Sequence, residues 1–233
     1  MTPEEIVARL LYRDGLILVI DKPAGLAVHK GPKAASSAGR ESLEDYFDAL
    51  RFGLPRAPAL AHRLDRDTSG CLVLGRHRKA LAELGRLFKS GGIGKTYWAV
   101  VEGGPAEPEG RIDAALGRKD ASRGWWMKHD PKGQPATTTW KVLGRAAELA
   151  WLALEPLTGR THQLRVHCAE MGWPVVGDAI YGSAPRTGGP GLHLHAREIV
   201  VPIYKNRDPI KVRAPVPPDM RERMRACGWE GET

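Results

Sequence analysis

A stretch of nine residues, from His62 to Gly70, combines side chains that could do chemistry with side chains that make turns. Asp, Thr, Ser and Gly favour turns because they hydrogen-bond their own backbone or tolerate unusual dihedral angles. Asp65 lies between Arg63 and Arg66, so we expect its carboxylate to stay ionised. An ionised carboxylate on a turn can act as a nucleophile or as a base. The same spacing is also that of an ordinary loop, and spacing alone favours this structural interpretation.

The residues that could bind a metal ion do not have the spacing of a metal site. A calcium loop needs a bidentate Glu at its twelfth position, and counting from Asp65 that position is Arg76. His162 and His167 stand five residues apart, whereas a helical zinc pair stands four apart and has a Glu after the first His. The sequence therefore predicts no metal site.

The glycine-rich stretch Gly91–Thr96 resembles a nucleotide-binding loop. Such a loop needs a glycine where Lys89 stands, a strand before it and a helix after it. Here the pattern predicts a helix before it and a strand after it. We expect a helix exit, with Gly91 or Gly92 in the left-handed conformation, and no cofactor.

The overall composition points to a globular protein with an anionic partner. Among 233 residues, Lys and Arg outnumber Asp and Glu by 35 to 27, which gives a net charge of +8. An excess of this size makes nucleic acid the first candidate, although charge alone does not decide it. Three distant cysteines without a CxxC motif fit a reducing compartment. We find no signal peptide and no apolar run near the ~20 residues that cross a membrane, so we expect a cytoplasmic protein.

Hydrophobic periodicity predicts helices and strands throughout the chain. A cap at Ser42-x-x-Asp45 predicts a further helix start, and the Gly, Ala and Ser content of 31–39 predicts a flexible loop. The expected helices are 3–11, 79–88, 161–171 and 219–226, and the expected strands are 16–20, 71–74, 96–101, 111–116, 136–142, 149–154 and 192–200.

Two arginines outside the Asp65 turn have positions that suggest a role, and a tyrosine has one that suggests the core. Arg165 shares a helical face with Leu164 and Cys168, so it should be partly buried and should need an acidic partner. Arg160 lies at the start of the same helix, where backbone N–H groups favour a phosphate. Tyr97 lies on a strand face that is usually part of the core.

Several short sequence motifs, taken in order, resemble those of the RluA-type pseudouridine synthase family. The resemblance runs from about Asp14 to about Pro217, and only about a dozen residues precede Gly15, so no N-terminal S4 domain is expected. The motifs are DKPAGL (21–26), HRLDRDTSG (62–70), KTYWAVVEG (95–103), GRTHQLRVH (159–167), GDAIYG (177–182) and LHA (194–196).

The resemblance implies a fold and a domain organisation. The fold would be α+β, with a large mixed, mainly antiparallel sheet, flanking helices and a basic central cleft. A single catalytic domain would cover 14–217, with an N-terminal extension at 1–13 and a C-terminal helix and tail at 218–233.

The resemblance also implies an activity, the isomerisation of uridine to pseudouridine in a stem-loop of ribosomal or transfer RNA. Asp65 would be the catalytic carboxylate, Arg165 would hold it ionised and oriented, and Tyr97 would pack on the uracil. Neither a membrane nor an obligate protein partner is expected.

Three further residues would bind the RNA, and two other function classes stay open. Arg63 would fill the gap when the base leaves the stack, and His62 and Arg160 would contact the substrate. One alternative is a non-catalytic RNA-binding protein. The other is a nucleoside or glycoside hydrolase that uses Asp65 and Asp67 as an acid–base pair.

Overall fold

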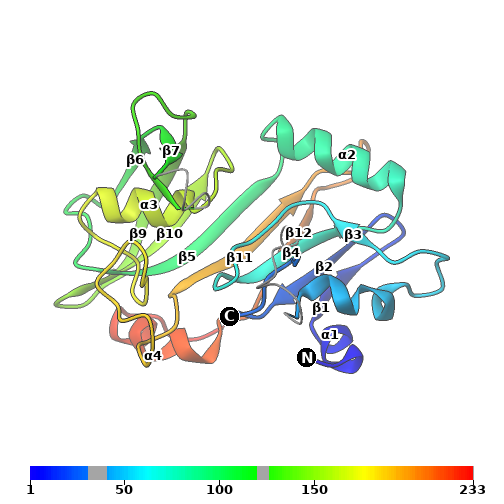
Figure 1. The fold of residues 1–233 in the computed structure, drawn as a ribbon, viewed down its shortest axis with the longest axis horizontal. Helices are drawn as coiled ribbons and strands as arrows, with labels where there is room; N and C mark the ends of the chain where they lie inside the picture. The colour runs from blue at the N-terminus through cyan, green and yellow to red at the C-terminus, as the bar shows by residue number, and fades with distance from the viewer. Residues whose placement is uncertain (31–40, 120–125, 233) are drawn as a thin grey trace. The chain divides into compact units, whose positions relative to one another are not determined.

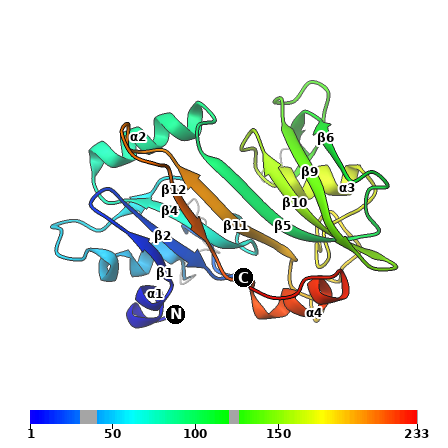
Figure 2. The same cartoon turned by 180° about the vertical axis from the view of Figure 1, so that it is seen from behind.

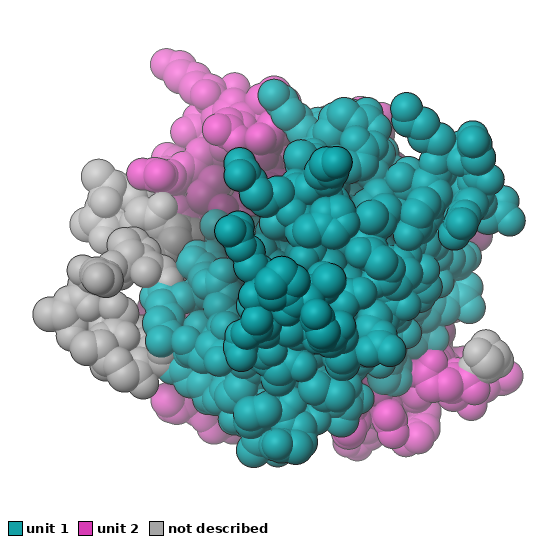
Figure 3. All heavy atoms as spheres, turned by 90° about the vertical axis from the view of Figure 1, so that its right-hand side faces the viewer, with its two compact units in different colours: residues 1–94, 196–215 teal, residues 95–195, 216–233 magenta. Residues whose placement is uncertain are grey.

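The computed structural model describes residues 1–30, 41–119 and 126–232, which form two compact units. The first unit comprises Met1–Gly94 and Ala196–Pro215, and the second comprises Lys95–His195 and Val216–Thr233 (Figure 3). The expected loop at 31–39 lies outside the described residues. The predicted boundaries 1–13, 14–217 and 218–233 stay a prediction.

The sheet of the first unit has two buried strands at its centre, β2 (Ile17–Lys22) and β4 (Ser69–Gly75), which pair antiparallel. Strands buried on both faces have continuous apolar runs, as both of these do. Their neighbours in the order β1-β2-β4-β11 are β1 (Leu10–Arg13) and β11 (Leu194–Val201), while β3 (Ala59–Leu60) pairs with β4 and β12 (Ile210–Arg213) with β11 (Figure 1).

Helix α2 (Arg78–Lys89) covers this sheet, as its periodicity predicts. Its residues Leu84 and Leu87 lie in one apolar cluster with Val73 of β4. Gly91 follows the helix with φ 72°, which confirms the expected helix exit.

The N-terminal helix is shorter than its periodicity predicts. Helix α1 covers Pro3–Ala8, and the expected extent to Leu11 is wrong because Leu10–Arg13 pair with β2 instead. The cap at Ser42 is confirmed, since the Asp45 carboxylate accepts from the Ser42 N–H at 2.9 Å. The helix that follows, η2 (Leu43–Leu50), is a 3-10 helix.

The second unit contains an antiparallel sheet in the order β5-β10-β9-β6. A separate antiparallel hairpin joins β7 to β8. The expected strand 111–116 is wrong as one element, because β6 ends at Asp113 and β7 begins at Leu116. The bounds are β5 (Gly94–Glu102), β6 (Glu109–Asp113), β7 (Leu116–Arg118), β8 (Met127–His129), β9 (Thr137–Arg145) and β10 (Leu149–Pro156).

Two helices complete the second unit. Helix α3 (Gln163–Glu170) contributes Leu164 and Cys168 to a core cluster that also contains Leu154 of β10. Helix α4 (Pro218–Ala226) packs in another cluster with Trp151, and both helices can be followed from behind in Figure 2. The α+β class with a mainly antiparallel sheet is confirmed.

Candidate active site

Asp65 lies in a tight turn directly before β4. The Thr68 N–H donates to the Asp65 carbonyl at 3.2 Å, and Thr68 is buried while Asp65 is half-buried. Gly70 has φ 103°, and a Cβ at this position would collide with the backbone of Ala196. The turn is therefore fixed to a buried strand, which suits a carboxylate that must be held in place.

A fully buried lysine supports this turn. The Nζ of Lys22 donates to the carbonyls of Pro23 at 2.7 Å, Leu26 at 2.8 Å and Arg66 at 2.9 Å. An ammonium group has three N–H donors, so all three have a carbonyl partner. Burial lowers the pKa of Lys22 to about 8, against the nearby acidic charges, and the group is still an ammonium at neutral pH. Lys22 thereby fixes the carbonyl of the residue that follows Asp65.

The two neighbours of this turn that we expect to bind RNA lie in different environments. The Nε2 of His62 accepts from the Val73 N–H at 3.0 Å, and the His62 ring lies 4.7 Å from that of Phe88. One nitrogen of His62 thus supports β4, so a contact with RNA would have to use the other edge of the ring. Arg63 is exposed, as its predicted role requires. Both RNA contacts stay predictions.

Tyr97 lies on β5 and is half-buried. It packs against the cluster that contains the buried residues Ala99 and Val101, so the three share one face of the strand. Its predicted contact with the uracil stays a prediction.

Arg165 is 4% exposed and has an acidic partner, as the helical pattern predicts. Its Nε lies 2.7 Å from Oδ2 of Asp178, and its Nη2 lies 2.8 Å from Oδ1. Burial raises the pKa of the Asp178 carboxyl, but the bonds and charge of Arg165 and two backbone N–H bonds outweigh it and lower the pKa. The pair is therefore ionised and bidentate.

Tyr181 and His162 lie next to this ion pair. The Tyr181 ring centroid lies 5.2 Å from the Cζ of Arg165. Its hydroxyl accepts from the Met127 N–H at 2.9 Å and lies 2.8 Å from Nδ1 of His162. His162 has φ 53°, a left-handed conformation that is strained for a residue other than glycine. Such residues concentrate at functional sites.

Arg160 lies three residues ahead of α3 and not at its start as expected, because the helix begins at Gln163. Its Nε donates to the Pro135 carbonyl at 3.1 Å. The side chain is half-buried, and its predicted contact with phosphate stays a prediction.

Gln163 ties the segment before α3 to strand β9. Its Oε1 accepts from the hydroxyl of Thr158 at 2.7 Å, and its Nε2 donates to the Thr137 carbonyl at 2.9 Å and to the hydroxyl of Thr138 at 3.0 Å. The Thr138 hydroxyl lies 2.9 Å from Nδ1 of His167. A buried polar network of this kind holds a segment rigidly when every member is bonded.

The expected catalytic residues belong to different units. Asp65 is part of the first unit, while Tyr97 and Arg165 are part of the second. The expected contact between Asp65 and Arg165, and the expected basic cleft, therefore stay predictions.

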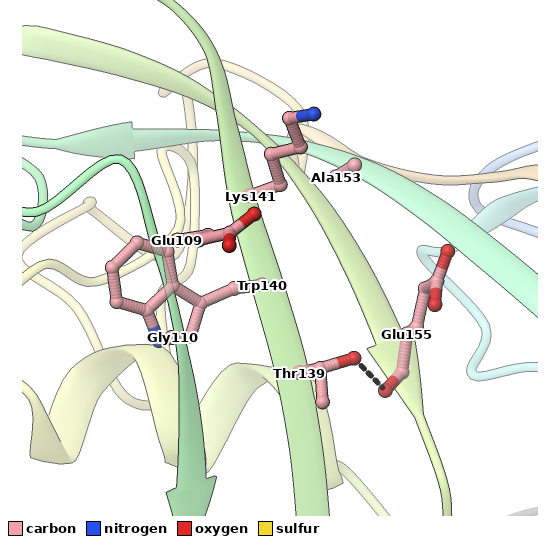
Figure 4. Close-up of a pocket in the computed structure, with 7 residues that line it drawn as sticks. All are labelled: Glu109, Gly110, Thr139, Trp140, Lys141, Ala153 and Glu155. Atoms are coloured by element: carbon pink, nitrogen blue, oxygen red, sulfur yellow. Dashed lines mark hydrogen bonds between the residues drawn. The ribbon is translucent and has the colours of Figure 1, made fainter.

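A hollow of about 390 Å³ lies on the sheet of the second unit, over β6, β9 and β10 (Figure 4). Its lining combines the carboxylates of Glu109 and Glu155 with the ammonium of Lys141, and the hydroxyl of Thr139 donates to the Glu155 carbonyl at 3.5 Å. Two carboxylates repel phosphate, so this hollow does not suit an RNA backbone. It contains none of the expected site residues.

Two absences can be stated for the part of the chain that the structure describes. No cluster of three or more His, Cys, Asp or Glu residues there could hold a metal ion. No helix there is long and apolar enough to span a membrane.

Residues 16–170 match the family model of the RNA pseudouridylate synthases. The chain belongs to this family. The matched range contains Asp65, Tyr97 and Arg165. A protein of Zymomonas mobilis named as an uncharacterized RNA pseudouridine synthase is 41% identical over 214 residues, which cover 91% of this chain and 95% of that protein.

Further relatives agree with this assignment. The ribosomal large subunit pseudouridine synthase D of Yersinia pestis is 36% identical over 184 residues. These residues cover 79% of this chain and 55% of the Yersinia pestis protein. The solved structure of human RNA pseudouridylate synthase domain containing 1 is 26% identical with a TM-score of 0.73, and 96% of each chain is covered. The human domain containing 4 protein, at 24% identity and a TM-score of 0.80, supports the fold. The chain is an RNA pseudouridine synthase, an isomerase, and RNA is its substrate.

Two residues of the site were missed as functional candidates in the sequence. Lys22 belongs to the motif DKPAGL, but a lysine is usually exposed, and nothing in the sequence indicates that three carbonyls surround it. Asp178 belongs to the motif GDAIYG. The available signal was the expectation that Arg165 needs an acid, together with an Asp at the start of a turn.

Proposed function

We propose that this synthase modifies uridine in a stem-loop of ribosomal or transfer RNA, with Asp65 as the catalytic carboxylate. The ribosomal substrate is supported by relatives from Yersinia pestis, Borreliella burgdorferi and Xanthomonas campestris that are named ribosomal large subunit pseudouridine synthase D. The net charge of +8 supports binding to a polyanion.

The reaction has simple requirements. The bond from uracil N1 to the sugar breaks, the uracil turns, and C5 bonds to the same sugar carbon while the C5 proton is lost and N1 gains one. Atoms and electrons balance within the nucleotide, so neither an oxidant nor a group donor is needed. The residues must therefore supply a carboxylate, a fixed orientation and a place for a proton.

Each of these needs has a candidate residue. The carboxylate of Asp65 attacks the sugar or base, or removes a sugar proton. Arg165 keeps it ionised and oriented, because a guanidinium close to a carboxylate favours the charged form. Tyr97 packs on the uracil and is our candidate to accept the C5 proton, while His62, Arg63 and Arg160 bind the RNA.

One observation carries the proposal. The family model spans the residues around Asp65, and Asp65 stands on a turn that a buried ammonium and a buried strand hold rigidly. A carboxylate in such a position can keep its geometry while the base moves.

The test compares Asp65→Asn with Asp67→Asn on RNA that lacks pseudouridine. Asp67 is a matched control, since it lies two residues away in the same turn and pairs with Arg66 at 3.0 Å. We expect Asp65→Asn to form no detectable pseudouridine while it binds RNA nearly as the wild type does, and Asp67→Asn to stay active. Mass spectrometry of digested RNA measures the product.

Each failure of this test has its own meaning. Pseudouridine formation by folded Asp65→Asn would refute the role of Asp65. Release of free uracil that requires both acids would favour the hydrolase instead. Pseudouridine maps of total RNA from cells with and without the protein would identify the modified uridine. A cytoplasmic location is part of the proposal, supported by three unpaired, buried cysteines.

A further inference from the structure

The guanidinium of Arg165 is held in one orientation. Arg165 is only 4% exposed. Its Nε donates to Oδ2 of Asp178 at 2.7 Å, and its Nη2 donates to Oδ1 at 2.8 Å. A guanidinium is planar, so two parallel bonds along one edge fix the plane and the direction of the opposite edge. The ring of Tyr181 lies along the same group, with its centroid 5.2 Å from Cζ.

Asp178 is itself held by its own turn. Its Oδ1 also accepts from the N–H of Ile180 at 2.9 Å and from the N–H of Tyr181 at 3.0 Å. The Asp178 side chain is 0% exposed. Since backbone groups fix the carboxylate and the carboxylate fixes the guanidinium, the position of Arg165 depends on the turn 178–181 as well as on α3.

We propose that Asp178 is a positioning residue, which holds the guanidinium of Arg165 in the orientation in which it can orient the catalytic carboxylate. This inference rests on the proposed function, in which Arg165 acts on Asp65. It assigns to the second unit a residue that touches neither the RNA nor the reacting atoms but determines how fast the bound complex reacts.

The chain offers a matched control for this ion pair. Arg111 and Asp113 form the same bidentate contact at 2.6 and 3.0 Å, but both side chains are 57% exposed. Asp113→Asn therefore removes the same charge from the same kind of pair, away from Arg165. We expect it to react at the wild-type rate.

The experiment measures single-turnover rates at saturating RNA for Asp178→Asn and Asp178→Glu, with the folded fraction followed by thermal unfolding. We expect Asp178→Asn to react about 100-fold more slowly, as for a reacting group misplaced by about 1 Å. RNA half-saturation should change less than about threefold, because binding does not need this orientation. Asp178→Glu keeps the buried charge but moves the guanidinium, and we expect it to be at least about tenfold slower.

A second background separates positioning from a general structural role. In Arg165→Ala protein, the further change Asp178→Asn should alter the remaining rate by less than about threefold, since there is no guanidinium left to orient. Equal fractional losses in both backgrounds would mean that Asp178 only stabilises the fold, and would overturn the proposal.

The remaining outcomes are also decisive. A wild-type rate for folded Asp178→Asn would overturn the proposal, and if that variant does not fold, a wild-type rate for Asp178→Glu would do so. Asp65→Asn is measured alongside. If it stays active, the proposed function fails, whereas an inactive Asp65→Asn with a normal Asp178→Asn refutes this inference alone.

Discussion

Two turns, one in each unit, use an aspartate in opposite ways. In the turn 65–68, the supporting bonds fall on backbone carbonyls, since the Asp65 carbonyl accepts from Thr68 and the Arg66 carbonyl accepts from Lys22. In the turn 178–181, they fall on the carboxylate, which accepts from two backbone N–H groups and from Arg165.

In the function that we propose, this difference corresponds to a carboxylate that reacts, Asp65, and one that positions, Asp178. Asp178 is 1% exposed and its oxygens serve the structure, so a substrate does not reach it. Asp65 is half-buried, and the bonds described above support its turn through the carbonyls of Asp65 and Arg66. A loop that is fixed through its main chain allows the side chain to act on a substrate.

The largest effect should come from removing the cation of the second turn. Arg165→Ala leaves the buried Asp178 without its partner, which should lower the free energy of unfolding by about 3–5 kcal/mol. Single-turnover rates per folded molecule should fall about 100-fold or more. Arg165→Lys should not fully restore the rate, because Lys cannot make the two parallel bonds.

Arg160→Ala is the comparison for this first prediction. In the proposed function Arg160 binds the RNA, so its loss should raise the RNA concentration needed for half-saturation and should not slow the bound complex. Urea unfolding and single-turnover rates at saturating RNA measure the two effects. Equal rates for Arg165→Ala and the wild type would remove Arg165 from the site.

The first turn should respond to the loss of its buried ammonium. Lys22→Met leaves three carbonyls without their donor, which should lower the free energy of unfolding by about 2–4 kcal/mol. Because the Arg66 carbonyl is then unsupported, the rate at saturating RNA should also fall. Unchanged stability by urea unfolding would show that these carbonyls find water or other donors.

The pH dependence of this lysine is a third prediction. Lys22 has a pKa of about 8 in the folded protein, below its ordinary value of 10.5. Between these values the unfolded chain binds more protons, so the contribution of Lys22 to stability rises with pH from about 8 and levels off near 10.5, by up to about 3 kcal/mol. The difference in unfolding free energy between wild type and Lys22→Met should grow over this range and stay constant below pH 8.

The smallest effect should come from the exposed copy of the ion pair. Asp113→Asn breaks a bidentate contact with Arg111 that water already screens, so the unfolding midpoint and the rate should not change measurably. A loss as large as that in Asp178→Asn would mean that burial does not distinguish the two pairs.

The elements that periodicity determines could be predicted from the sequence. The spacing of apolar residues placed α2 and α4 within a residue of their observed bounds, and the continuous apolar runs identified β2 and β4. Helix α1 was predicted too long because pairing with β2 overrides the local preference of Leu10 and Leu11 for a helix.

The partners of individual side chains could not be predicted, because they come from distant parts of the chain. The Val73 N–H donates to His62, which lies 11 residues earlier in the chain, and Lys22 donates to the Arg66 carbonyl, which lies 44 residues later. Helical spacing predicted that Arg165 would be buried with an acid, but only the fold selects Asp178.

The network at Gln163 ends at a buried histidine, His167, whose ring proton can be placed. The Nε2 of His167 lies 3.0 Å from the Ala114 carbonyl, which can only accept, so Nε2 carries the proton of the neutral ring. Nδ1 then accepts from the Thr138 hydroxyl, which itself accepts from the amide nitrogen of Gln163. Burial lowers the pKa of His167 and so favours the neutral ring, against the bond to the Ala114 carbonyl. The Gln163 amide also accepts the N–H of Arg160. The nitrogen-15 resonance of His167 Nδ1 should thus report whether the Thr138 hydroxyl and the Gln163 amide, which also binds the Arg160 N–H, are in place.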